Sequence, residues 1–127
     1  MEELLRVLDG RDHWARVEAL EKLGALGDAA ALPHLAGVLE DGKECRHTRG
    51  AAIASLVALR AAETPELLRA LKRTLLYDED SEVRAAAATA LGELGFRGAA
   101  GALRHVAARE KEPDLARAAA HALAKLG

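Results

Sequence analysis

Five histidines and one cysteine are the side chains of this sequence that bind metal ions most readily. They are His13, His34, His47, His105, His121 and Cys45. No histidine lies three or four residues from another histidine or from the cysteine, so no helix face presents a ready pair of ligands. Cys45 and His47 come closest, but residues two positions apart point to different sides of a helix. We therefore predict no metal site and no cofactor.

The candidate nucleophiles are two serines, Ser55 and Ser81, and neither stands in the Gly-x-Ser-x-Gly setting of a hydrolase. The Gly-x-x-Gly segments 24–27 and 92–95 lack the other residues of a phosphate-binding loop, so we expect them to end helices. No residue is therefore predicted to be catalytic, and we interpret the chain as not being an enzyme.

A recurring segment marks the elements that must position these side chains. It ends at four leucines spaced by 33, 35 and 32 residues, which are Leu26, Leu59, Leu94 and Leu126. An arginine stands upstream of the first three, at Arg16, Arg49 and Arg84. Self-similarity at this period indicates stacked units of supersecondary structure.

The composition favours helices in every unit. Half of the residues are hydrophobic (50%), but the only aromatic side chains are Trp14, Tyr77 and Phe96, so leucine, alanine and valine must build the core. Alanine, leucine, glutamate, arginine and lysine dominate, as in tandem helices, and the sequence predicts an all-α fold. Asn and Gln are absent, which favours a thermophilic source.

The apolar spacing within the third unit predicts a helix from about Asp80 to Leu94, followed by Gly95 as its C-terminal cap. The corresponding helix of the first unit is expected from about Asp12 to Gly27. Shorter apolar segments between these helices predict a second helix in each unit. We predict about eight helices in one domain (1–127), with half repeats at 1–10 and 111–127 and helix pairs at 11–42, 43–77 and 78–110.

The pattern Asp-x-x-Val/Ala-Arg-x-x-Ala-x-x-x-Leu-x-x-Leu-Gly, present at 12–27 and 80–95, resembles the HEAT-like repeats of phycobilin lyases. The resemblance implies an α-solenoid of helix pairs stacked as a right-handed superhelix. It also implies that aspartates and arginines of the first helices join neighbouring repeats through hydrogen bonds, which here would involve Asp12, Arg16, Arg49, Asp80 and Arg84.

The second and fourth units depart from this pattern. The second unit has Cys45 in place of the aspartate and Arg60 in place of the glycine, so its first helix is expected to run on into a looser turn. In the fourth unit Arg117 stands one position late, which turns its side chain by about 100° around the helix and removes it from the predicted ladder.

The net charge of −2 argues against a protein whose main task is to coat nucleic acid. In solenoids of this kind the second helices line the concave face, where a partner binds. The polar positions on those helices begin at an acidic N-terminal end with Glu2, Glu3 and Arg6 and become basic further along the chain, with His34, Glu66, Arg69, Lys72, Arg73, Arg104, His105 and Arg109. This largely basic set predicts a site for an acidic peptide or a phosphate backbone, unless these side chains serve only to keep an alanine-rich helix soluble.

The last predicted helix has no second helix to cover it, so its apolar residues form another candidate surface. These are Leu115, Ala119, Ala122, Leu123 and Leu126. Exposed edges of repeat arrays are usually closed by a polar cap or by another chain, so we expect self-association or partner contact here.

The N-terminal segment is acidic and lacks the apolar core of a signal peptide, and no charge-free segment is long enough to span a bilayer. We expect a cytoplasmic protein without a membrane segment. The leading interpretation is a non-catalytic scaffold that binds an unidentified protein. Binding of nucleic acid or an acidic ligand through the basic helices is the alternative, and a bilin-lyase-type chromophore factor is a remote one.

Overall fold

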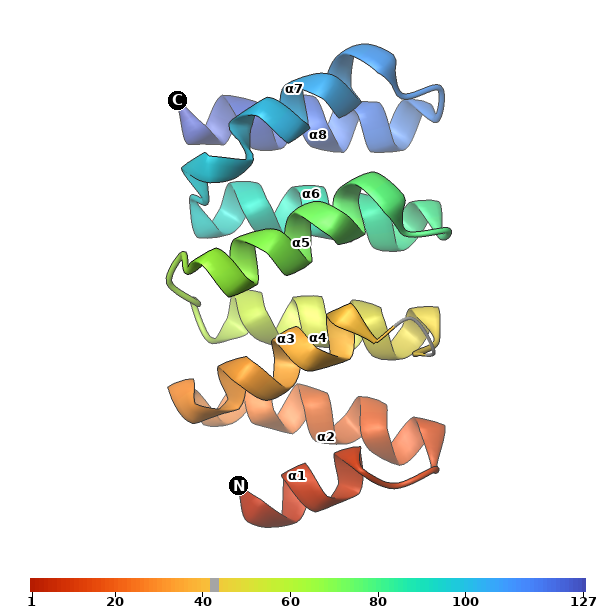
Figure 1. The fold of residues 1–127 in the computed structure, drawn as a ribbon, viewed down its shortest axis with the longest axis vertical. Coiled ribbons are helices and arrows are strands. Elements are labelled where there is room, and N and C mark those ends of the chain that lie inside the picture. Colours follow the sequence, from red (N-terminus) through yellow and green to blue (C-terminus); the bar gives the residue numbers. More distant parts are fainter. Residues whose placement is uncertain (42–43) are drawn as a thin grey trace. The chain divides into compact units, whose positions relative to one another are not determined.

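The computed structural model of the chain describes residues 1–41 and 44–127. These residues form two compact units, each of which is larger than one of the predicted repeats. Unit 1 is Met1–Ala61, and unit 2 is Ala62–Gly127. Each unit consists of helices joined by short turns, which agrees with the predicted all-α fold (Figure 1). The predicted boundary between the repeats 11–42 and 43–77 lies outside the described residues.

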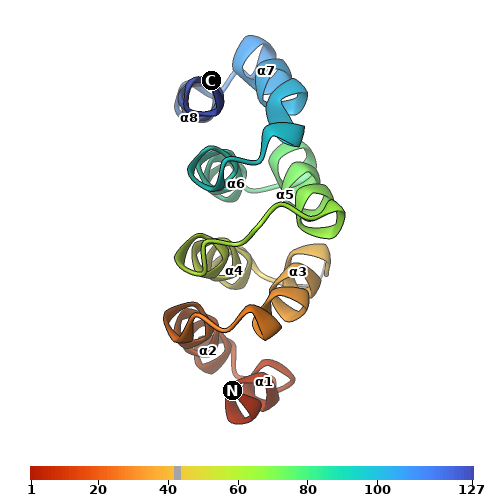
Figure 2. The same cartoon turned by 90° about the vertical axis from the view of Figure 1, so that its left-hand side faces the viewer.

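The first unit contains α1 (Glu2–Leu8), α2 (His13–Leu26), a 3₁₀ turn (Ala29–Ala31), α3 (Leu32–Glu40) and α4 (Arg46–Ala58). Helices α2 and α4 pack side by side in one layer, and α1 and α3 lie in a second layer against them (Figure 2). Leu20, Leu23, Leu35 and Leu56 are completely buried and form the core between the layers.

The second unit repeats this arrangement with α5 (Pro65–Tyr77), α6 (Ser81–Leu94), a 3₁₀ turn (Arg97–Ala99), α7 (Ala100–Arg109) and α8 (Pro113–Leu126). Helices α6 and α8 form one layer, and α5 and α7 form the other (Figure 2). The buried side chains of Leu71, Leu91, Phe96, Leu103 and Leu115 join the two layers.

The starts of α2 and α6 follow from side-chain caps. The carboxylate of Asp12 accepts a hydrogen bond from the backbone N–H of Ala15, and Asp80 accepts from the N–H groups of Glu82 and Val83. Such bonds satisfy N–H groups that have no partner within the first helical turn. The predicted helices at 12–27 and 80–94 are therefore confirmed as α2 and α6.

The helix ends are confirmed at Gly27 and Gly95, whose φ angles of 70° and 73° lie in the left-handed region that suits glycine. The expectation that α4 runs on into a looser turn is wrong, since α4 ends at Ala58. Arg60 itself adopts a φ of 51°, and the N–H of Ala61 donates to the carbonyl of Leu56 at 3.2 Å. The left-handed turn that follows α2 and α6 therefore also follows α4, although Arg60 takes the place of the glycine. The hydrogen bond between Ala61 and Leu56 closes this turn.

The first glycine of each Gly-x-x-Gly segment has a different role from the predicted one. A Cβ atom added to Gly24 would lie 2.9 Å from the Cα of Ser55 in α4, and one added to Gly92 would lie 2.7 Å from the Cα of Ala122 in α8. These glycines lie inside α2 and α6, where they let neighbouring helices approach closely, and only the second glycine of each pair ends the helix.

None of the helices in residues 1–41 and 44–127 combines the length and the apolar character that crossing a bilayer requires.

Candidate functional site

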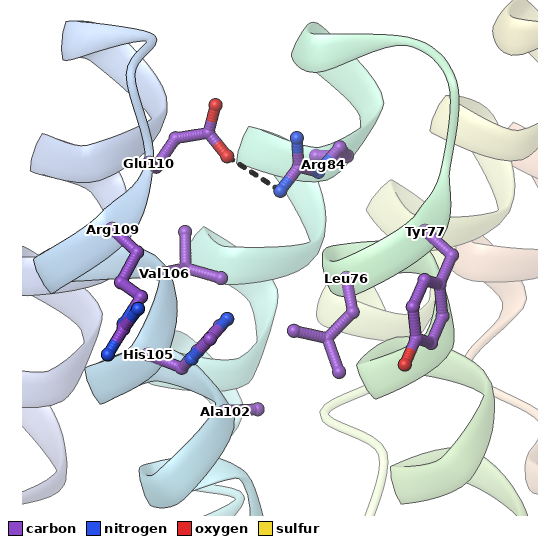
Figure 3. Close-up of a pocket in the computed structure, with 8 residues that line it drawn as sticks. All are labelled: Leu76, Tyr77, Arg84, Ala102, His105, Val106, Arg109 and Glu110. Carbon is purple, nitrogen blue, oxygen red and sulfur yellow. Dashed lines mark hydrogen bonds and ion pairs between the residues drawn. The ribbon is translucent and has the colours of Figure 1, made fainter.

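The second unit has a pocket of about 380 Å³ between α5, α6 and α7. Leu76 and Tyr77 at the end of α5 form one wall, and His105 and Arg109 of α7 form the opposite wall (Figure 3). Because residues 105 and 109 are one turn apart on a helix, their side chains reach the same side of α7.

The pocket combines an apolar lining with hydrogen-bond donors. Leu76, Ala102 and Val106 supply the apolar surface, while Tyr77 is 79% exposed and adds a hydroxyl group. Among the described residues, no ion pair or hydrogen bond is found for the guanidinium group of Arg109. The arrangement suits a ligand with both an apolar part and a negative charge.

An ion pair closes one end of this pocket. The guanidinium group of Arg84 in α6 donates to the Glu110 carboxylate at 2.7 Å, and its Nε donates to the Leu75 carbonyl at 2.8 Å (Figure 3). The backbone N–H of Glu112, and then the nearby Arg84, hold the pKa of Glu110 below its ordinary value against the opposing effect of burial. Glu110 therefore stays ionised and keeps Arg84 in place.

The structure places the predicted binding residues in two separate units. Seven lie in unit 2, and His34 is an exposed residue of α3 in unit 1. Of the seven, His105 and Arg109 line the pocket, while Glu66, Arg69, Lys72, Arg73 and Arg104 lie elsewhere on α5 and α7. The prediction of one groove across all second helices stays a prediction. Sequence reasoning missed Tyr77, although a lone tyrosine at the end of a basic helix was a visible signal.

The arginines of the predicted ladder contact backbone carbonyl groups and glutamates of other segments, and the ladder itself stays a prediction. Arg16 donates from Nε to the Leu8 carbonyl at 3.0 Å and forms an ion pair with Glu44, just as Arg84 joins Leu75 and Glu110 in unit 2. Arg49 also donates to the backbone carbonyl of Glu44.

Arg16 therefore ties the end of α1 to a glutamate that precedes α4, and Arg84 ties the end of α5 to a glutamate that precedes α8. Asp12 and Asp80 cap their own helices, and the expectation that they also join repeats stays a prediction. Arg117 agrees with expectation, since it is 76% exposed and pairs with Asp114 of its own helix.

Most of the C-terminal apolar residues predicted for self-association are buried within unit 2, and self-association itself stays a prediction. Leu115, Ala119, Ala122 and Leu126 are each at most 8% exposed, because α8 packs against both α6 and α7. Leu123 alone is half-buried. Their burial was missed because a helix without a following partner still has two neighbours within its own unit.

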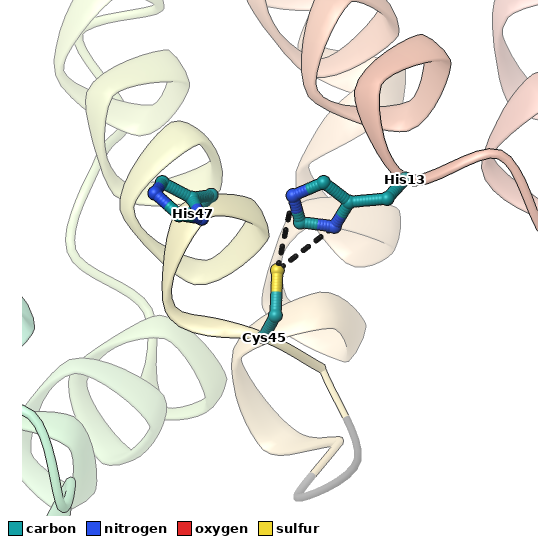
Figure 4. Close-up of side chains that lie close together, drawn as sticks. All are labelled: His13, Cys45 and His47. Atoms are coloured by element: carbon teal, nitrogen blue, oxygen red, sulfur yellow. Dashed lines mark hydrogen bonds between the residues drawn. The ribbon is translucent and has the colours of Figure 1, made fainter.

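The first unit brings together three possible metal ligands. His13 lies at the start of α2, and Cys45 and His47 lie at the start of α4, with their ligand atoms all within 4.8 Å of one another (Figure 4). The sulfur of Cys45 is 3.0 Å from Nδ1 and 3.5 Å from Nε2 of His13.

The expectation that Cys45 and His47 face different sides of a helix is wrong. Cys45 is the N-cap residue of α4, with extended backbone angles (φ −78°, ψ 166°), so helical spacing does not apply to it. Burial raises the pKa of its thiol, but hydrogen bonds from the side chain and backbone of Thr48 and from the His47 backbone outweigh this and lower it.

Comparisons with known proteins agree with the arrangement of the chain as helix pairs. Residues 69–127 match the model for HEAT repeats, and residues 15–41 match the model for the PBS lyase HEAT-like repeat. A search of curated proteins found no match to the chain. The chain is a HEAT-like repeat protein, and its helix pairs are those of an all-α solenoid.

Proposed function

We propose that this chain is a non-catalytic binding module that recognises an acidic segment of a partner protein through α5 and α7. The observation that supports it most is the pocket in unit 2, where Tyr77, His105 and Arg109 surround an apolar lining. Tyrosine and arginine are the residues that most often dominate the energy of protein interfaces.

The charge of α5 and α7 taken as whole helices favours an acidic partner. Helix α5 carries Arg69, Lys72 and Arg73 against a single acidic residue, Glu66, and α7 carries Arg104 and Arg109 without an acidic residue. A carboxylate held by a guanidinium group gains a charge-assisted hydrogen bond with defined geometry. The neighbouring basic residues would raise the rate of encounter and the specificity more than the affinity.

A protein segment suits this surface better than a nucleic acid does. The whole chain carries a net charge of −2, and Glu110 and Glu66 lie beside or in the proposed surface. Single-stranded nucleic acid is usually bound by several aromatic platforms, whereas Tyr77 is the one aromatic residue among those lining this pocket.

Binding of nucleic acid through the basic residues of α5 and α7 remains the alternative candidate. It predicts that affinity falls steeply with salt concentration, because several bound counterions are released together. A chromophore-handling role is the remote alternative that the PBS lyase HEAT-like repeat at 15–41 leaves open. This chromophore-handling role would require the formation of a coloured bilin adduct.

The test is a fluorescence anisotropy titration of a labelled glutamate-rich peptide with the purified chain. We expect Arg109→Glu to weaken binding by about tenfold or more, because it removes one charge-assisted hydrogen bond and adds repulsion. Arg117→Glu is the matched control, since it makes the same charge change on the exposed face of α8 and should bind as the parent does.

Two outcomes would contradict the proposal. One is equal binding by the parent and Arg109→Glu, and the other is absence of peptide binding by the parent. A titration with labelled single-stranded DNA at several salt concentrations distinguishes the alternative, which requires tighter binding of DNA than of peptide.

A further inference from the structure

The strongest cluster outside the pocket of unit 2 is formed by His13, Cys45 and His47. These residues offer two imidazole nitrogens and one thiol sulfur, the donor types that Zn²⁺ and related late transition metals prefer. They come from two helices that pack directly against each other, α2 and α4, so the fold itself holds the donors together.

The separation between Cys45 and His13 is close to that in a metal site. Bonds of about 2.3 Å to sulfur and about 2.0 Å to nitrogen, at tetrahedral angles, place the ligand atoms roughly 3.3–3.6 Å apart. The sulfur of Cys45 already lies 3.0 and 3.5 Å from the two ring nitrogens of His13, and every ligand atom lies within 4.8 Å of the others. Side-chain rotations that shorten the longer separations would complete the geometry.

The surroundings of Cys45 resemble those that orient a ligand sulfur. Thr48 is fully buried, with its hydroxyl oxygen 3.1 Å from this sulfur, and its backbone N–H donates to the sulfur at 3.5 Å. Hydrogen bonds of this kind fix the direction of a ligand and tune its charge.

Aromatic side chains hold the two imidazoles in position. The ring of His13 lies 4.8 Å from that of Trp14 and 5.6 Å from that of His47, measured between centroids. Trp14 also contacts His47 at 5.3 Å. The indole therefore lies beside both imidazole ligands while remaining 64% exposed.

A buried carboxylate next to the cluster would also gain from a cation. Glu44 precedes Cys45 and is only 9% exposed, and its Oε2 has no hydrogen-bond partner in the part of the chain that the structure describes. Arg16 pairs with the other oxygen alone. A positive charge at the adjacent cluster would stabilise this carboxylate, since a bound ion is the largest charge of its surroundings.

We propose that His13, Cys45 and His47 form a binding site for a divalent late transition-metal ion, with Zn²⁺ as the expected occupant. Three protein ligands leave the fourth tetrahedral position open to a water molecule or an external ligand. The ion would bridge the starts of α2 and α4 and so clamp the first unit.

The site is tested by equilibrium dialysis of the untagged chain against Zn²⁺. We expect one ion per chain, and binding roughly 100-fold weaker in Cys45→Ser and in His47→Ala, because each loses one of three ligands. His121→Ala is the matched control, since it removes an exposed histidine of α8 and should bind Zn²⁺ as the parent does. Circular dichroism of each variant checks that the helices are retained.

The absorption spectrum of bound Co²⁺ provides a second readout, which does not depend on the folding stability of the variants. A thiolate-to-cobalt charge-transfer band is expected in the parent and must vanish in Cys45→Ser, because the chain has a single cysteine. Trp14 is the single tryptophan, so its fluorescence should be quenched as the paramagnetic ion binds. Absence of the cobalt band, or one Zn²⁺ bound with unchanged affinity in Cys45→Ser, would overturn the proposal.

Discussion

Arg16 and Arg84 make equivalent contacts in the two units, and they show what a sequence pattern reveals about a single residue. The repeated arginine predicts a structural role, and the structure agrees. Its partners, Glu44 and Glu110, were missed because they lie 28 and 26 residues away, in connecting segments where the repeat pattern has no fixed position. The spacing that recurs within the helices of this chain does not extend through such connections.

Replacement of Arg16 by alanine should destabilise the chain by about 2–3 kcal/mol. It leaves the buried Glu44 carboxylate without its cation and removes the bond to the Leu8 carbonyl. Urea unfolding measures the effect, and Arg117→Ala is the control, because an exposed ion pair contributes about 0–1 kcal/mol. Equal losses in the two variants would contradict the assigned role of Arg16.

The lowered pKa of Glu110, which is caused first by the backbone N–H of Glu112 and then by the ion pair with Arg84, predicts a dependence of stability on pH. Because the pKa of Glu110 is lowered below 4.5 in the folded chain, its contribution is fully present above that pH and is lost as the pH falls through the folded pKa. Arg84→Ala should therefore make stability less sensitive to pH in this acidic range than Arg117→Ala, which removes the same charge. Unfolding titrations at a series of pH values measure this, and identical profiles would contradict it.

At the scale of helices, local chemistry accounts for most of what the sequence predicted. Asp12 and Asp80 mark helix starts and Gly27 and Gly95 mark ends, because capping depends on a few neighbouring residues. The turn at Arg60 was mispredicted, since a packed chain can hold an arginine at positive φ when the surrounding hydrogen bonds fix it.

The cluster of His13, Cys45 and His47 was missed for a related reason. Its members belong to two helices, so its formation depends on how α2 packs against α4 and not on spacing along one helix. The position of Cys45 just before α4 also removed it from the helical geometry that the sequence argument assumed.

A glycine-to-alanine substitution is expected to have opposite effects on stability at a glycine that contacts a neighbouring helix and at one that does not. Gly92→Ala should destabilise the chain by about 1 kcal/mol or more, because the new methyl group overlaps the backbone of α8 and this outweighs the gain in helix propensity. Gly37→Ala in α3 meets no atom within 4 Å and should stabilise by about 0.5–1 kcal/mol. Thermal or urea unfolding measures both, and a stabilising Gly92→Ala would refute the proposed close contact.

For the whole molecule, the repeat pattern established the class of fold, and the matches at residues 15–41 and 69–127 confirm it. The location of a binding surface was harder to predict from the sequence. The basic residues of the second helices were found from their positions, but the pocket of Leu76, Tyr77, His105 and Arg109 depends on the packing of α5, α6 and α7. Burial of α8 also shows that an unpaired terminal helix need not present an open apolar face.

The central claim is that α5 and α7 of the second unit form the face that binds a partner. Nuclear magnetic resonance titration of the labelled chain with the glutamate-rich peptide tests it most directly. The account predicts chemical-shift changes centred on Tyr77, His105 and Arg109. Changes centred on the exposed side of α6 and α8, at Thr89, Arg117 and Ala120, would contradict it.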